Sequence, residues 1–192
     1  MVLIIIDGLD ASGKNTQAIR LADFLKKQGK TVFLRFHPSS DSFFGIKTKQ
    51  FLYSTGKKAH FAAAFFYSID VVRSILLYSW REYDYIVFVR YLMGTAYLPS
   101  PMHKFAYRFF AALVPTSRFM FFLDVTPEEA SRRIRLARRN LEMFENPNRL
   151  EQTRQKALSL ALTDNWTIIN ANESMETVEN EIRKVLLENS GN

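Results

Sequence analysis

The sequence contains no cysteine and only three histidines among its 192 residues. Without cysteine the chain can form no disulfide, use no thiolate nucleophile and build no cysteine-ligated zinc site. The three histidines are scattered and form no metal-ligand spacing. Low-complexity segments, internal repeats and linkers are also absent, whereas 47% of the residues are apolar. This composition predicts a folded chain with a sizeable core.

The sequence gives little indication of a secreted or membrane protein. The apolar start ends at Asp7 and lacks both a basic region and a small-residue cleavage site, so it does not resemble a signal peptide. Residues 61–80 form an apolar stretch long enough to span a bilayer. Asp70 and Arg73 lie in its middle, where charges are costly in lipid. We therefore expect a buried helix there, no membrane contact and a cytoplasmic protein.

A net charge of +7 accompanies 14% aromatic residues. Such a basic surface could bind nucleic acid, anionic lipid or phosphorylated small molecules. The charge concentrates around residues 132–139 and forms no long tail. Which of these ligands binds therefore depends on where this basic segment lies in the fold.

Segments with strand and helix patterns alternate along the chain. Apolar, β-branched runs predict strands at residues 2–6, 31–36, 85–89, 119–123 and 166–170. Helical periodicity and capping signals predict helices at 14–28, 42–53, 59–80, 102–113, from 126 into the arginine-rich segment, at 149–161 and at 173–188. This order predicts one α/β domain over residues 1–192, with a five-stranded parallel sheet in a three-layer α/β/α fold.

A glycine-rich segment lies directly between the first strand and the first helix. It reads Gly8-Leu9-Asp10-Ala11-Ser12-Gly13-Lys14, which fits the P-loop spacing. In such a loop, backbone N–H groups and the helix N-terminus bind phosphate oxygens, and the lysine reaches the β- and γ-phosphates. The predicted ATP-binding residues are Gly8, Ala11, Ser12, Gly13, Lys14, Asn15 and Thr16.

Asn15 stands where a P-loop normally has Ser or Thr. The usual hydroxyl binds Mg²⁺, and an amide oxygen can do so directly or through water. Asn15 is therefore the candidate metal ligand, although weakened metal binding is an equally open interpretation. Thr16 is expected to be the next helical residue and no replacement ligand.

Several segments, in the correct order, resemble the thymidylate kinase family. They are residues 7–17, the Arg35-Phe36 pair, the Arg90-Tyr91 pair, and residues 122–130, 142–145 and 166–171. The resemblance covers nearly the whole chain. It implies a P-loop NTPase fold and transfer of the ATP γ-phosphoryl group to a nucleoside monophosphate with Mg²⁺, dTMP being the first candidate.

The resemblance also implies roles for individual residues. Asp10, Phe36, Tyr67, Arg73, Arg90 and Tyr91 would form the acceptor side, and Ala171 would lie beside adenine. Arg90 would bridge the donor and acceptor phosphates. Because Ala11 removes a loop arginine, the helper arginine would come from a lid at about residues 132–146, as Arg135, Arg138 or Arg139. These arginines with Lys14 and Arg90 form the predicted catalytic set.

Three positions depart from the family pattern. Val89 replaces an acid before Arg90, and Asp7 could partly compensate for it. Val71 and Ser39 replace two acceptor-side arginines. The alternative hypothesis is therefore an ATP-binding protein with an altered acceptor, or one without catalytic activity, which Asn15 and Val89 together favour. Nucleic-acid binding through the arginine segment is less favoured, since a lid is expected there. The family also implies a homodimer, through residues 59–80.

Overall fold

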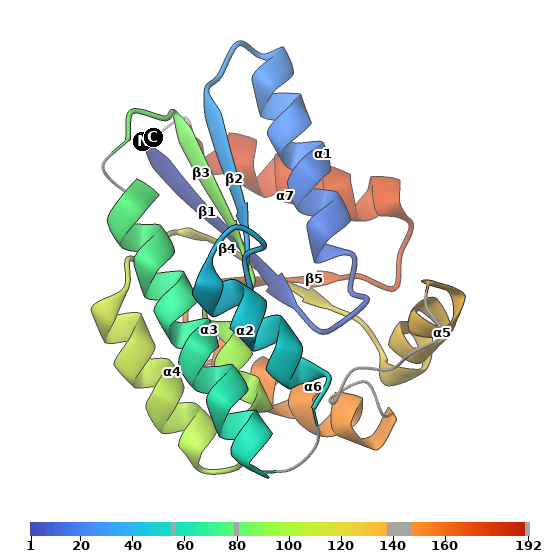
Figure 1. Cartoon of the computed structure of the whole chain (residues 1–192). Helices are drawn as coiled ribbons and strands as arrows, with labels where there is room; N and C mark the ends of the chain where they lie inside the picture. Colours follow the sequence, from blue (N-terminus) through green and yellow to red (C-terminus); the bar gives the residue numbers. More distant parts are fainter. Residues whose placement is uncertain (55–56, 79–80, 138–146, 191–192) are drawn as a thin grey trace.

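The computed structural model describes residues 1–54, 57–78, 81–137 and 147–190 (Figure 1). These residues form an all-parallel, five-stranded sheet, as the sequence predicted. The strands are β1 (Val2–Gly8), β2 (Val32–Phe36), β3 (Tyr85–Val89), β4 (Phe119–Asp124) and β5 (Trp166–Asn170), in the order β2-β3-β1-β4-β5. Because β1 lies in the centre, both of its edges are paired.

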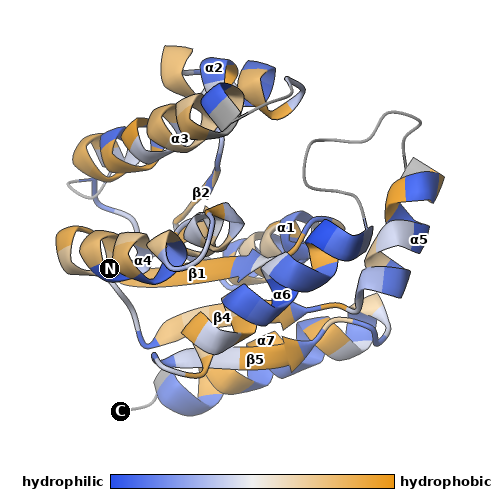
Figure 2. Ribbon diagram, turned by 90° about the horizontal axis from the view of Figure 1, so that it is seen from below, coloured by the Kyte–Doolittle hydropathy of each residue, from blue (hydrophilic) through white to orange (hydrophobic). Residues whose placement is uncertain are grey.

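Helices cover both faces of this sheet. The first face carries α1 (Lys14–Lys27) and α7 (Met175–Ser190). The second carries the short 3-10 helix η1 (Met93–Tyr97), α4 (Met102–Leu113) and α6 (Pro147–Ala161). Helices α2 (Phe43–Leu52) and α3 (Lys57–Tyr78) lie side by side, away from α4 (Figure 2). Helix α5 (Pro127–Ala137) leads to the undescribed residues 138–146.

The central strands are apolar along their whole length because both of their faces are buried. In β1, Ile4 and Ile6 join the core beneath α1 and α7, whereas Ile5 joins the core beneath α4 and α6. The same alternation holds in β3, where Val89 faces the first core and Phe88 the second. This is the pattern expected when successive side chains of a strand point to opposite faces.

The strand order brings β1 and β3 together at their carboxyl ends. Ile6 pairs with Val89, so the phosphate loop after β1 and Arg90 after β3 lie at one edge of the sheet. In open parallel sheets such an edge is where ligands bind. The sequence did not predict η1, which follows this edge, and it placed the start of α6 two residues late. Pro147 begins α6, in a first-turn position where proline costs no hydrogen bond.

Candidate active site

The loop between β1 and α1 has the backbone of a phosphate-binding turn. Gly13 and Ala11 have positive φ angles of 87° and 59°, and the N–H of Ser12 donates to the carbonyl of Leu9 at 3.2 Å. A side chain at Gly8 would place Cβ 2.6 Å from the Leu123 carbonyl oxygen, so only glycine fits against β4. The loop therefore approaches the sheet closely and leads directly into the N-terminus of α1, the end of a helix that favours an anion.

Lys14 lies at the base of this loop with only 4% of its surface exposed. Its Nζ donates to the Leu9 carbonyl at 2.6 Å and lies 4.0 Å from the Asp10 carboxylate. The ammonium charge is thus directed into the loop. This is the arrangement that the P-loop spacing predicts, with the charge next to where phosphates would bind.

Asp7 holds the turn that follows β3. Its Oδ2 accepts hydrogen bonds from the N–H groups of Tyr91, Leu92 and Met93 at 2.8, 3.2 and 3.0 Å, and its Oδ1 from Gly8 at 3.2 Å. Burial raises the pKa of Asp7, although these backbone donors and Lys14 act in the opposite direction. The carboxylate is therefore committed to the backbone, which argues against a role for Asp7 in place of the acid missing at Val89.

This turn fixes Arg90 in an unusual conformation. Arg90 has a φ of 57°, a left-handed value that is rare outside glycine. Its N–H donates to Ile6 at 3.2 Å, and its carbonyl accepts from Nδ1 of His37 at 3.1 Å. Burial lowers the pKa of His37 to about 4 while Asp70 opposes the shift, so the ring is neutral at pH 7. The strained backbone is held from both sides, as is common at functional sites.

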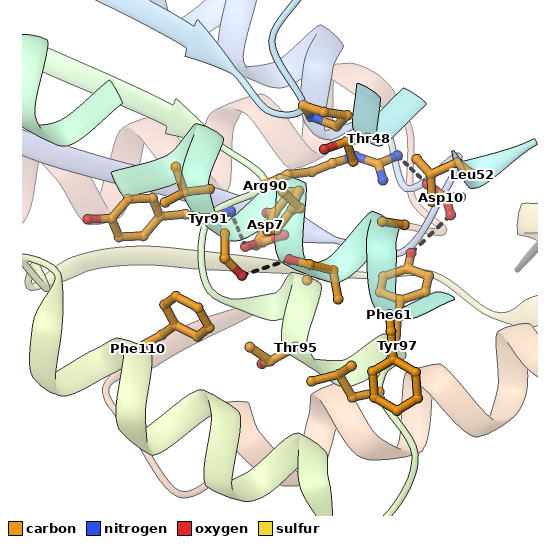
Figure 3. Close-up of a pocket in the computed structure, with 18 of the residues that line it drawn as sticks. Asp7, Asp10, Thr48, Leu52, Phe61, Arg90, Tyr91, Thr95, Tyr97 and Phe110 are labelled. Atoms are coloured by element: carbon orange, nitrogen blue, oxygen red, sulfur yellow. Dashed lines mark hydrogen bonds and ion pairs between the residues drawn. The ribbon is translucent and has the colours of Figure 1, made fainter. Parts of the chain in front are cut away.

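Asp10 accepts hydrogen bonds from the turn after β3 and from η1. The Arg90 guanidinium donates to its Oδ1 and the Tyr97 hydroxyl to its Oδ2, the latter at 2.9 Å (Figure 3). Burial alone would raise the pKa of Asp10, but the charges of Arg90 and Lys14 outweigh it and lower the pKa to about 2. Asp10 is therefore ionised throughout the neutral range and orients Arg90.

The low pKa of Asp10 predicts part of the acid sensitivity of the fold. The folded-state pKa of about 2 lies below the ordinary value of 3.8, so Asp10 stabilises the fold above about pH 4 and loses this contribution as the pH falls towards 2. Asp10→Asn should be less stable at pH 7. Between pH 5 and pH 2 the unfolding free energy of wild type should fall by about 2 kcal/mol more than that of the variant. Urea unfolding across this range measures the difference; parallel pH curves would contradict the assignment.

A cavity of 530 Å³ opens beside the loop, and we call it the apolar cavity. Its wall comes mainly from α3, η1 and the turn after β3 (Figure 3). Aromatic and aliphatic side chains dominate, and they include Leu52, Phe61, Tyr67, Val71, Tyr91, Leu98 and Phe110. The Tyr67 ring packs against Gly94, where any Cβ would lie 2.7 Å from it. A flat, largely apolar group with a few polar atoms would fit this space.

A second space of 630 Å³ lies on the other side of Arg90, and we call it the basic hollow. Its lining combines the end of β2, the following turn, α2 and the start of α1, and it includes Asn15, Arg35, Phe36, His37, Ser40, Lys49 and Arg90. Three of these side chains are cationic. The hollow is therefore suited to an anion.

The predicted acceptor-side residues separate into three groups. Asp10, Tyr67, Arg90 and Tyr91 all line the apolar cavity. Phe36 lines the basic hollow, which Arg90 shares and which Asn15, predicted for ATP and the metal, also lines. Arg73 lines neither space, because Val71 is the residue of that turn of α3 that faces the cavity. On the donor side, Thr16, predicted for ATP binding, is exposed on the first turn of α1.

On the other side of the phosphate loop, Arg133 ties together two segments distant in sequence. From α5 it donates to the carbonyl oxygens of Ala11 at 3.3 Å and Ala171 at 2.9 Å, and it pairs with Glu129 at 2.7 Å. Ala171, predicted to lie beside adenine, is thereby linked to the loop. Arg135 is exposed on α5, whereas Arg138 and Arg139 lie outside the described residues.

Sequence reasoning missed several residues of the site. Tyr97, Thr48 and Arg149 line the apolar cavity, and Arg154 pairs with Asp124 at 2.7 and 2.8 Å to fix α6 against β4. None belongs to a local motif. Only their helical spacing and polar character could have marked them, and many surface residues share both properties.

Few groups in the described part of the chain could bind a metal directly. No cluster of three or more His, Asp or Glu side chains is found there. Asp7 is committed to backbone N–H groups, Asp10 pairs with Arg90, and Val89 is apolar and buried. The amide of Asn15 remains, next to the loop. This donor set fits a Mg²⁺ ion that arrives already bound to phosphates and retains most of its waters.

Comparison with known proteins agrees with this geometry. A family profile described as thymidylate kinase matches residues 6–182. The chain is 30% identical to a probable thymidylate kinase of Metallosphaera sedula, over 99% of this chain and 96% of that protein. A thymidylate kinase of Prochlorococcus marinus is 25% identical over 98% of this chain and 97% of that protein. The solved structure of Candida albicans thymidylate kinase shares the fold, with a TM-score of 0.80 at 20% identity over 98% of this chain and 92% of that one.

Proposed function

The chain belongs to the thymidylate kinase family, and we propose that it transfers the γ-phosphoryl group of ATP to dTMP, giving ADP and dTDP. Family membership makes it a phosphotransferase with nucleotide substrates. The observation that carries the proposal is the position of Arg90, which lies between the phosphate loop and an apolar cavity of nucleoside size. ATP would bind on the loop, and the thymine and deoxyribose would occupy the cavity.

Lys14 and the N–H groups of residues 11–15 would bind the donor phosphates. An oxygen of the dTMP phosphate then forms a bond to the γ-phosphorus while the bond to the β-γ bridging oxygen breaks, and ADP leaves with the electron pair. A phosphate monoester has a second pKa near 6, so the attacking oxygen is already ionised at pH 7. No general base is needed, which explains how buried Val89 is compatible with the reaction.

The residues around the transferred group would act by position and charge. Arg90 would bridge the two phosphates, and Asp10, released from part of its ion pair, would accept a hydrogen bond from the sugar hydroxyl. Arg135, Arg138 or Arg139 would approach from the lid at about residues 132–146. Mg²⁺, with Asn15 as its nearest protein ligand, would neutralise charge on the phosphates. Alignment and charge neutralisation account for most catalysis of this kind.

Arg133 should contribute to ATP binding, because it holds Ala171 against the phosphate loop. Arg133→Ala is expected to raise the KM for ATP about tenfold with little change in the KM for dTMP. Arg132→Ala is the matched control, since Arg132 pairs with the same Glu129 but is exposed and bonds to neither Ala11 nor Ala171. Equal KM values for ATP in the two variants would contradict this role.

An acceptor panel tests the proposed function. Purified protein is incubated with Mg²⁺, ATP and each of dTMP, dUMP, dCMP, dAMP and dGMP, and ADP formation is measured. We expect the highest kcat/KM with dTMP. If another monophosphate gave a higher kcat/KM, that nucleotide and not dTMP would be the acceptor. ATP binding without turnover on any acceptor would favour the non-catalytic alternative.

The exposed face of α3 suggests a homodimer. Residues Phe61–Tyr78 are apolar enough to cross a membrane, yet Asp70 and Val71 on one side of this helix are buried within the protein. On the other side Phe65 and Leu76 are 62% and 63% exposed. A second copy would cover this surface and leave the protein soluble in the cytoplasm.

The mass of the protein in solution tests this assembly. Light scattering of the wild type should give a mass twice the 22.3 kDa of one chain. The Phe65→Glu variant should have the mass of a single chain, because the substitution places a charge in the interface. A wild-type mass of one chain at micromolar concentration would contradict the homodimer.

A further inference from the structure

The apolar cavity and the basic hollow are neighbouring spaces that share part of their lining. Pro38, Leu52 and Arg90 line both spaces, and Arg90 extends past Thr48 towards Asp10 and Leu52 (Figure 3). Successive residues of α2 divide between them, because Thr48 lines the apolar cavity and Lys49 the basic hollow. A molecule with an apolar end and an anionic end could therefore occupy both.

The basic hollow also adjoins the donor side. Asn15, which follows Lys14 at the start of α1, is part of its lining. An anion in the hollow would therefore lie beside the outer end of a polyphosphate bound on the loop. A phosphoryl acceptor requires this proximity.

Lys49 differs from the other cations of the hollow in its partners. The charge of Arg35 is offset by Asp41 at 2.8 Å, and Arg90 pairs with Asp10. The Nζ of Lys49 donates to the neutral Ser40 hydroxyl at 2.6 Å. Within the described residues no ion pair of Lys49 with a carboxylate is found. Its positive charge is thus available to an anion, with only a hydroxyl to be displaced.

The turn after β2 explains why this charge comes from α2. An arginine was expected at position 39, but Ser39 is buried, with its N–H and Oγ bonded to Asp70 at 2.7 and 2.6 Å. The turn is also packed tightly, since a Cβ at Gly45 would lie 2.2 Å from the Ser39 carbonyl oxygen. A long cationic side chain has no room at position 39. Ser40, the next residue, instead receives Lys49.

We propose that Lys49, together with Arg90, binds the phosphate of the monophosphate acceptor in the basic hollow, while the base and sugar occupy the apolar cavity. Lys49 thereby supplies the positive charge that Ser39 lacks. This inference rests on the proposed function, because it concerns the acceptor of the same reaction. It predicts that Lys49 distinguishes a nucleotide from its nucleoside.

Calorimetric titration with dTMP and with thymidine tests the inference. For Lys49→Ala we expect the Kd for dTMP to rise about tenfold, as for loss of one charge-assisted hydrogen bond, and the Kd for thymidine to change less than about twofold. Lys49→Arg should retain most of the dTMP affinity. Lys47→Ala is the matched control, since Lys47 lies on the same helix, bonds to Gln50 at 3.2 Å and lines neither space.

The outcomes separate the inference from the proposed function. Unchanged dTMP affinity in Lys49→Ala, or an equal loss for thymidine, would overturn the role of Lys49 even if wild type phosphorylates dTMP. Wild type that binds dTMP with the predicted dependence on Lys49 but forms no dTDP would retain the inference and overturn the proposed function. Thermal melts of each variant identify any loss caused by unfolding.

Discussion

Replacing Lys14 with alanine should lower kcat/KM for ATP by roughly 10²- to 10³-fold. The ammonium lies at the base of the loop, buried and directed inward, where it would neutralise the β- and γ-phosphates as charge shifts during transfer. A fixed charge in such a site is worth roughly 3–4 kcal/mol of transition-state stabilisation. Steady-state kinetics with dTMP as the acceptor measure the loss.

Two further variants make this result specific. Lys14→Met keeps the aliphatic volume and should be as inactive as Lys14→Ala, because the charge and not the packing is required. Lys26→Ala removes an exposed lysine from the last turn of the same helix and should keep full activity. Activity of Lys14→Ala within threefold of wild type would contradict the assignment of the loop.

Replacing Asp7 with alanine should destabilise the protein by about 3 kcal/mol or more. The buried carboxylate accepts four backbone hydrogen bonds, and its removal leaves buried N–H groups without acceptors. The free energy of unfolding in urea measures the effect. Asp23→Ala, an exposed position on α1, should change it by less than about 0.5 kcal/mol.

The same variant should also lose activity at temperatures where it remains folded. The Asp7 carboxylate accepts hydrogen bonds from the N–H groups that follow Arg90. Without this acceptor, the backbone of Arg90 would relax from its positive φ. The guanidinium would then leave its position between the two substrates. A folded Asp7→Ala protein with a normal kcat would show that the hydrogen bonds of Asp7 to the turn after β3 are not needed to position Arg90.

The phosphate loop could be predicted from sequence because all of its determinants are local. Glycine spacing, a preceding apolar strand and a following helix occur within about 20 residues, and each has a single structural meaning. The alternation of strands and helices similarly predicted the five-stranded parallel sheet, now confirmed. The expected kinase family is confirmed by the match over residues 6–182.

The acceptor side could be predicted only in part, because its contacts connect residues far apart in sequence. Asp7 was considered only as a partial replacement for the acid missing at Val89. Three of its four partners are backbone N–H groups 84 to 86 residues away, and such groups leave no pattern in the sequence. Arg133 lies within the predicted lid segment, but nothing in the sequence indicates its bonds to Ala11 and Ala171. Lys49 has no sequence signal of its own, because its place in the basic hollow depends on how α2 packs beside Arg90.

Transfer of label from γ-³²P-ATP to dTMP is the most direct measurement of the central claim. Wild-type protein with Mg²⁺ should place the label in dTDP, and omission of dTMP should leave it in ATP. Label that stays in ATP, or appears only as inorganic phosphate while dTMP is bound, would contradict a phosphoryl transfer between two nucleotides that meet at Arg90.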